Sequence, residues 1–236
     1  MILLAIIFLA IGIPASAETL PEWFIPLREA IYEQQLTADE ITPLYREASA
    51  KARGSLFGHD LYVMLSRCEY MMGRAYQLEE RNNEASARYE EGIRLAERAL
   101  EVRESAEAWQ MLAENISQNC VVRPPSYAMA NGLRVERYSR NALNIDPRNA
   151  ASRFMIAARW VYAPTPFHNY NRGLQMLKAI PDESDTQKDD TFNIYSSIGY
   201  TYMQQRNHAQ ARIWFLRSLE IYPTNKYVQS LLAGLR

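Results

Sequence analysis

Cysteine, glycine and histidine are scarce in this chain of 236 residues, which contains two cysteines, nine glycines and three histidines. Two cysteines are too few for a disulfide framework or a cysteine-built zinc site. So few glycines disfavour tight turns and β-hairpins and favour helices that pack through large side chains. Excess charge is also missing, because 26 basic residues oppose 27 acidic ones. We therefore expect no nucleic-acid partner, since no positive field exists to hold phosphates.

Motifs of catalysis and cofactor binding are absent as well. The glycines never form GxGxxG or GxxxxGK, and no GxSxG elbow occurs. His59, His168 and His208 lack the spacing of paired metal ligands, and we expect them to be scattered surface side chains. The sequence therefore predicts no enzyme activity, no catalytic residue, no cofactor and no metal site.

The two cysteines, Cys68 and Cys120, could in principle form one bridge, as an oxidising compartment would favour. On the helices predicted below, however, they lie at different heights, further apart than the roughly 7 Å between Cα atoms that a disulfide permits. Two unpaired thiols are the favoured prediction, with a single bridge as the alternative.

The start of the chain has the pattern of an export signal. Residues 2–13 are almost entirely apolar, and the small residues of 15–17 follow, as signal peptidase requires. The apolar run is shorter than the roughly 20 residues of a transmembrane helix. We expect a signal peptide over residues 1–17, although no Lys or Arg precedes the apolar run; an uncleaved anchor or an upstream start are the alternatives. The mature protein is expected to be periplasmic or secreted, without a membrane span.

A 34-residue pattern occupies residues 192–225 and predicts two helices, each with one apolar stripe, followed by a proline that ends the second. The small residues Gly199 and Ala211 would let the two helices approach closely. The tetratricopeptide repeat (TPR) family has W, L, G, Y, A, F, A and P at positions 4, 7, 8, 11, 20, 24, 27 and 32, and this block resembles it. The residues at those positions are Tyr195, Ile198, Gly199, Tyr202, Ala211, Phe215, Ser218 and Pro223.

Three earlier blocks resemble the same repeat with irregularities. In the first, Gly73 and Tyr89 take positions 8 and 24, and the second helix is long. In the second, Pro124 and Pro125 should delay the second helix until Ser126, which we expect to be its N-cap. The third is degenerate. The blocks cover residues 59–104, 106–149 and 150–183.

The flanking segments complete the expected architecture. Residues 18–58 are predicted to form an N-terminal helical cap, and residues 226–236 a C-terminal capping helix, because open stacks need covered ends. The acidic stretch 182–190 is expected to be a linker. The fold class predicted is all-α, and the resemblance implies a right-handed solenoid of about four TPR-like repeats over 59–225.

The resemblance also implies a binding surface. In the TPR family the first helix of each repeat lines an inner, concave wall through positions 2, 5, 9, 12 and 13. Arginines there would suit a carboxylate, and aromatic side chains would supply rigid apolar area. The matching residues are Arg67, Tyr70, Arg74, Gln77, Gln110, Glu114, Ser117, Phe154, Ala158, Tyr162, Asn193, Tyr200 and Met203.

Two functions stay open at this point. The first is a non-enzymatic, exported scaffold that binds a protein segment or partner in the cell envelope, with self-association as a further use of the stack. The second is a small-ligand-binding protein, for example for a small organic acid. Export and about four irregular repeats resemble the TPR-containing periplasmic component of some TRAP transporters. An open groove would favour a protein partner, whereas an enclosed cavity would favour a small ligand.

Overall fold

The computed structural model describes residues 20–235, so the predicted signal peptide at 1–17 lies outside the described residues. The described part is all-α, with eleven α-helices packed as sequential hairpin pairs, which confirms the predicted fold class. It contains no strand, apart from one isolated bridge pair. The helices are α1 (Ile25–Glu33), α2 (Ala38–Ser55), α3 (Gly58–Leu78), α4 (Asn82–Val102), α5 (Ala106–Val122), α6 (Pro125–Ile145), α7 (Ala150–Tyr162), α8 (Tyr170–Glu183), α9 (Lys188–Gln204), α10 (His208–Ile221) and α11 (Lys226–Ala233), preceded by the 3-10 helix η1 (Glu22–Phe24).

Polar side chains begin most of these helices. Six of them, α2, α5, α7, α8, α10 and α11, start after a Ser, Thr or Asn whose side-chain oxygen accepts a hydrogen bond from the first turn. Helix α6 differs from the prediction, because it begins at Pro125 with Pro124 before it, one residue ahead of Ser126. The prediction of Ser126 as N-cap was wrong, since proline is well tolerated at the first helical position, where its missing N–H costs nothing.

Within two of the pairs, a glycine on the first helix lies directly under an aromatic ring of the second. An added Cβ atom at Gly199 would come within 2.5 Å of the Phe215 ring, and one at Gly73 within 2.5 Å of the Tyr89 ring. Both aromatic side chains are fully buried. Positions 8 and 24 of the repeat therefore form the same close helix contact in the pairs α3–α4 and α9–α10.

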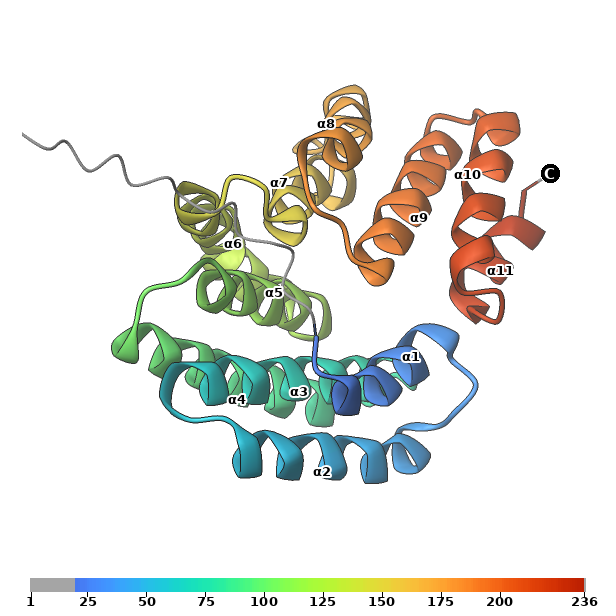
Figure 1. Cartoon of the computed structure of the whole chain (residues 1–236). Helices are drawn as coiled ribbons and strands as arrows, with labels where there is room; N and C mark the ends of the chain where they lie inside the picture. The colour runs from blue at the N-terminus through green and yellow to red at the C-terminus, as the bar shows by residue number, and fades with distance from the viewer. Residues whose placement is uncertain (1–19, 236) are drawn as a thin grey trace, which may run out of the picture.

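The stack curves back on itself, and α1 joins its two ends. In Figure 1 the helix pairs follow a path from α2 through α8 that brings α9, α10 and α11 round to α1. The ring of Tyr32 at the end of α1 stacks on Tyr222 at a centroid distance of 5.0 Å. It also meets Phe192 of α9 edge-on at 5.6 Å. The N-terminal segment therefore packs against the last repeat as well as against α2 and α3.

The last turn of α1 is completed by two residues that lie 191 and 193 positions further along the chain than the groups they bind. The final carbonyl groups of a helix have no donor within the helix. Here the Nδ2 of Asn225 donates to the Tyr32 carbonyl at 2.7 Å, and the Oγ1 of Thr224 donates to the Glu33 carbonyl at 2.9 Å. The start of α11 thus satisfies the end of α1, which makes the closure specific in position.

Two groups of buried hydrophobic side chains form the core. The larger group extends from η1 through α6 and continues into α9, α10 and α11. The smaller group lies between α7, α8 and α9. The larger core is continuous across the closure, so the ends of the chain share buried apolar contacts. None of the helices in residues 20–235 has the length and apolar character needed to cross a bilayer.

Candidate functional site

The predicted wall residues lie on the first helices of successive pairs, α3, α5, α7 and α9, and their surroundings differ from one end to the other. On α3, Arg67 and Tyr70 are buried, with 8% and 6% of their surface exposed. The guanidinium carbon of Arg74 lies 5.7 Å from the centre of the Tyr32 ring and 5.9 Å from that of Tyr70. Gln77 accepts a hydrogen bond of 2.5 Å from a tyrosine hydroxyl of α4. Helix α1 thus occupies the region where the arginines were expected to meet a ligand.

On α5 the wall is polar. The side chain of Gln110 donates to Glu114 at 3.1 Å and accepts from Asn149 at 2.9 Å, and Ser117 is half-buried. Burial raises the pKa of Glu114 to about 7, and the attraction of Arg67 offsets this only in part. A carboxyl group with this pKa is a mixture of charged and neutral forms near neutral pH.

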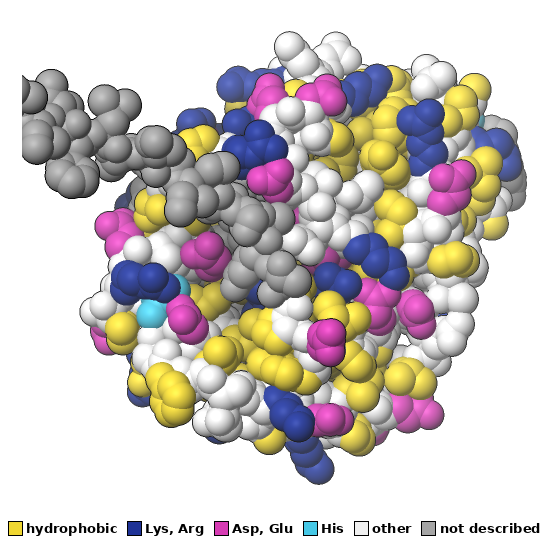
Figure 2. Space-filling model, in the orientation of Figure 1, with side chains coloured by type: hydrophobic (Ala, Val, Ile, Leu, Met, Phe, Trp, Pro, Cys, Tyr) yellow, Lys and Arg dark blue, Asp and Glu magenta, His cyan; other side chains and the backbone are white. Residues whose placement is uncertain are grey.

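Two acidic residues opposite this wall were not predicted as part of it. Asp189 and Asp190 lie in the first turn of α9. Burial raises the pKa of Asp190 to about 7, and the adjacent Asp189 carboxylate raises it further. Burial also raises the pKa of Asp189, while Arg28 of α1, 3.5 Å away, lowers it. Figure 2 shows acidic and basic side chains side by side between α1 and the start of α9. The sequence did indicate these two residues through the acidic stretch 182–190, but that stretch was interpreted only as a linker.

On α7 and α9 the predicted wall residues are more open. Phe154, Ala158 and Met203 are half-buried, and Met203 packs against the larger core. The Nδ2 of Asn193 donates to the Tyr32 hydroxyl at 3.0 Å, so Asn193 belongs to the contact with α1. Tyr162, which is 48% exposed, is therefore the most accessible wall residue on these two helices.

Tyr162, Tyr200 and Tyr227, the tyrosine cluster, lie on the successive first helices α7, α9 and α11. The rings of Tyr162 and Tyr200 lie 5.1 Å apart at 34°. Tyr162 is 48% and Tyr227 49% exposed. Sequence reasoning missed Tyr227, although it takes position 2 when the 34-residue numbering is continued past residue 225. Of the predicted wall's aromatic residues, Tyr162 is the most exposed.

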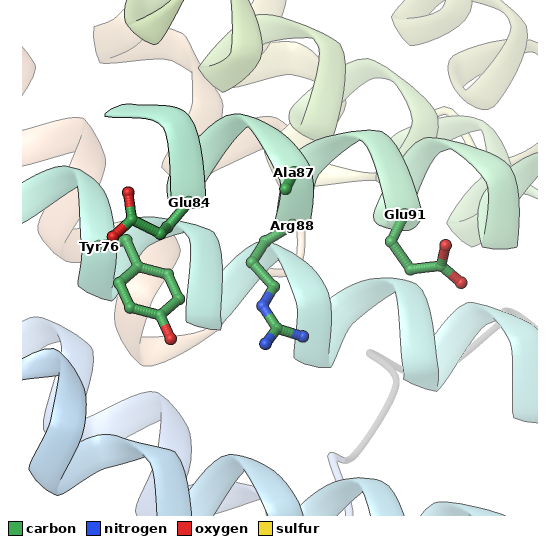
Figure 3. A pocket seen from close by; sticks show the side chains of 5 residues that line it. All are labelled: Tyr76, Glu84, Ala87, Arg88 and Glu91. Atoms are coloured by element: carbon green, nitrogen blue, oxygen red, sulfur yellow. The ribbon is translucent and has the colours of Figure 1, made fainter. Parts of the chain in front are cut away.

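Two hollows of about 230 and 280 Å³ lie along α4, and neither contains a predicted wall residue. In the first, shown in Figure 3, Tyr76 and Arg88 point toward α2, whereas Glu91 points away. The guanidinium of Arg88 already donates to Tyr45 at 3.1 Å and to Glu69 at 3.3 Å. Its charge is therefore engaged in holding α2, α3 and α4 together. The second hollow is lined by Asn82, Asn83, Ser86, Ala87, Glu90, Val122, Arg123 and Pro124.

The remaining candidate groups are structural. Cys68 and Cys120 are both free, as predicted, and burial raises the pKa of the Cys68 thiol to about 12. His59 was expected at the surface, but it is buried. Its ring nitrogen Nε2 lies 2.9 Å from the Ser105 hydroxyl. Among residues 20–235, no three His, Cys, Asp or Glu side chains are grouped as a metal site requires.

Comparison with known proteins supports the resemblance at the C-terminal end. The family model described as tetratricopeptide repeat matches residues 192–225, the block formed by α9 and α10. Proteins built from this repeat are usually non-catalytic binding scaffolds. A search of curated proteins found no match. Among solved structures, the chain is similar to YrrB, described as a TPR protein with an unusual peptide-binding site. The identity is 14%, 89% of each chain is covered and the TM-score is 0.38.

Proposed function

We propose that this protein is a non-enzymatic, TPR-like scaffold that binds a segment of a partner protein on the inner face of its C-terminal half. The observation that carries the proposal is the tyrosine cluster, in which Tyr162 of α7 and Tyr227 of α11 are half-exposed and the Tyr162 ring contacts that of Tyr200 of α9. Rigid aromatic side chains lose little entropy on binding and dominate the energetics of protein interfaces.

The opposite half of the inner face serves a different purpose. There α1 covers the predicted wall, and the side chains of Arg67 and Tyr70 are buried. The partner is therefore assigned to α7, α9 and α11, not to the whole length of the inner face. This restricts the expected footprint to a short segment.

We also propose that the protein works outside the cytosol, in the cell envelope. The support is the apolar run of residues 2–13 followed by the small residues of 15–17. Expression of the full chain with its own N-terminus in a bacterial host tests this. The periplasmic fraction should contain a product that lacks residues 1–17, measured by intact mass. A full-length cytosolic product would contradict the export proposal and leave the binding proposal untouched.

Selection from a random peptide library on the immobilised mature chain tests the binding function. We expect enriched peptides whose binding is lost in the Tyr200→Ala variant and retained in Phe57→Ala, which removes a ring that is 80% exposed between α2 and α3. No enrichment would overturn the proposal. Native mass spectrometry of the purified chain tests the small-ligand alternative, which a tightly retained small molecule would favour.

A further inference from the structure

Helix α6 carries an exposed apolar stripe in its first half. Met129 is 85% and Leu133 is 70% exposed. Residues four apart lie on the same face of a helix, so these two side chains are neighbours. Arg137, which is also exposed, continues the stripe by one further turn. Contiguous exposed apolar side chains mark contact surfaces, whereas single ones are common on any protein.

Two arginine side chains beside this stripe converge on one phenol oxygen. Arg134 donates to the Tyr138 hydroxyl at 3.1 Å, and Arg137 donates to the same hydroxyl at 3.2 Å. The second hydrogen bond of Arg134 goes to the neutral side-chain amide of Asn131. Tyr138 is buried, and its ring stacks on Trp109 of α5 at a centroid distance of 5.2 Å. A fixed acceptor therefore keeps the two guanidinium groups close together.

No carboxylate of the described chain pairs with these two arginines. Helix α6 contains a single acidic residue, Glu136, which already pairs with Arg140 at 2.6 Å and with Arg159 of α7. Neither Arg134 nor Arg137 takes part in an ion pair elsewhere in residues 20–235. The one acid of this helix is thus fully engaged by other arginines.

The positive charge at this point is unbalanced. Burial raises the pKa of Tyr138, but the hydrogen bonds from Arg134 and Arg137 outweigh burial and bring it below its ordinary value. The bond to Tyr138 raises the pKa of Arg134, and Glu97 of α4 adds a weaker attraction from beyond ion-pair distance. Like charges one turn apart on a helix repel each other, and a neutral phenol supplies no counter-charge. A carboxylate would supply it and would accept from both guanidinium groups.

We infer that Met129, Leu133, Arg134 and Arg137, the α6 surface, dock an acidic, amphipathic helix of a partner protein. A carboxylate of that helix accepts from the two arginines, whose planar forks suit one such group better than a diffuse layer of lipid headgroups. Apolar side chains one turn away cover Leu133 and Met129, because four residues rise about 6 Å on either helix. The α6 surface is separate from the tyrosine cluster, so this inference does not rest on the function proposed above.

Fluorescence anisotropy with two labelled peptides at low ionic strength tests this inference on the mature chain. Both are helices of about 18 residues built on alanine and glutamine, whose single stripe carries two leucines and then either two glutamates or two glutamines. We expect the glutamate peptide to bind at least about tenfold more tightly. Arg137→Gln and Met129→Ser, both at exposed positions, should each weaken its binding at least about fivefold. The matched controls Arg212→Gln and Leu216→Ser, at exposed positions of α10, should leave it unchanged.

A further variant separates the α6 surface from the inner face. Tyr227→Ala, which removes a half-exposed ring of the tyrosine cluster, should bind the glutamate peptide like the wild type. A loss of binding in this variant would place the peptide on the inner face and overturn the inference. The scaffold function is tested independently, through the random library and Tyr200→Ala.

Several other results would overturn the inference. The glutamate peptide could fail to bind, could bind no better than the glutamine peptide, or could bind in a manner insensitive to Arg137→Gln. Binding of the chain to phosphatidylglycerol vesicles that Arg137→Gln abolishes, without peptide binding, would assign the α6 surface to a membrane. A dimer that Met129→Ser converts to a monomer, again without peptide binding, would assign it to a second copy of the chain.

Discussion

Gly199 shows how one missing Cβ atom positions two helices. The Phe215 ring occupies the space that a side chain at residue 199 would need, at 2.5 Å from the ideal Cβ position. Because Phe215 is fully buried, the ring has little freedom to move aside. The same arrangement at Gly73 and Tyr89 makes the glycine a requirement of the helix pair.

Gly199→Ala should lower the free energy of unfolding by about 1–3 kcal/mol, since overpacking outweighs the gain in helix propensity. Gly132→Ala is the matched control, because an added Cβ at that helical position meets nothing within 4 Å. The control should be neutral or more stable by up to about 1 kcal/mol. Urea denaturation measures both, and equal stability of the two variants would contradict the packing account.

Glu114 makes stability depend on pH in an unusual direction. Its pKa in the folded chain is about 7, above its ordinary value of 4.5, because of burial near Asp189 and despite Arg67 and Arg74. Between these two values the folded state holds more protons than the unfolded state. The contribution of Glu114 therefore lowers the stability as the pH rises from about 4.5 to 7. Asp190, with a pKa raised to about 7, acts in the same direction.

Glu114→Gln should flatten this dependence, by up to about 1.4 kcal/mol per pH unit for one proton. Glu47→Gln, which replaces an exposed carboxyl on α2, should leave the slope of the wild type unchanged. The measurement is the free energy of unfolding in urea at several pH values between 5 and 8. A Glu114→Gln slope equal to that of the wild type would argue against a buried, protonated Glu114.

At the scale of elements, the start of α11 completes the end of α1. Asn225 caps α11 by accepting from the Val228 N–H at 3.1 Å and donates to the Tyr32 carbonyl at 2.7 Å. Its side chain is buried, so neither bond can be replaced by bulk water. Two helices that are distant in sequence thus depend on one amide group.

Asn225→Ser should keep the cap of α11 but lose the bond to α1, at a cost of about 1–3 kcal/mol. Asn225→Ala loses both and should cost about 1 kcal/mol more. As control, Asn207→Ser changes the exposed N-cap of α10 and should be nearly neutral. Thermal denaturation followed by circular dichroism ranks the variants. Wild-type stability of Asn225→Ser would show that the bond to α1 contributes nothing.

At the scale of the whole molecule, the closure changes how the stack should unfold. In a linear solenoid each repeat contacts only its neighbours, so its ends can open independently. Here Tyr32 of α1 contacts both Phe192 and Tyr222, and the larger core extends through both ends of the described chain. We expect the first and last helix pairs to unfold together.

Tyr32→Ala should remove about 3–5 kcal/mol, because the ring is almost fully buried. It should also uncouple the ends, so that backbone amides of α9 to α11 exchange faster than those of α3 and α4. Hydrogen exchange with mass spectrometry measures this, with the exposed Phe57→Ala as control. A uniform loss of protection over all helices would contradict closure through α1.

Much of the local structure could be predicted. The apolar stripes and the prolines predict the helices, and the positions of Gly73 and Gly199 predict which faces of each pair meet. The N-cap of α6 was predicted two residues too late, at Ser126 instead of Pro124, since Pro125 fits the first helical position. The wall residues were predicted to share one continuous surface. That prediction missed the covering by α1, because the position of a residue within its repeat does not show which other helix packs on it.

Sequence by itself thus determined the helices, their order and their pairing, because these depend on residues within one 34-residue period. The tertiary structure alone decided that α1 covers Arg67 and Tyr70, that Asp189 and Asp190 become buried, and that Tyr162 and Tyr227 stay half-exposed. These outcomes depend on the curvature summed over all the pairs. A small rotation between neighbours leaves little trace in any single repeat, yet it brings residues 32 and 225 into hydrogen-bond contact.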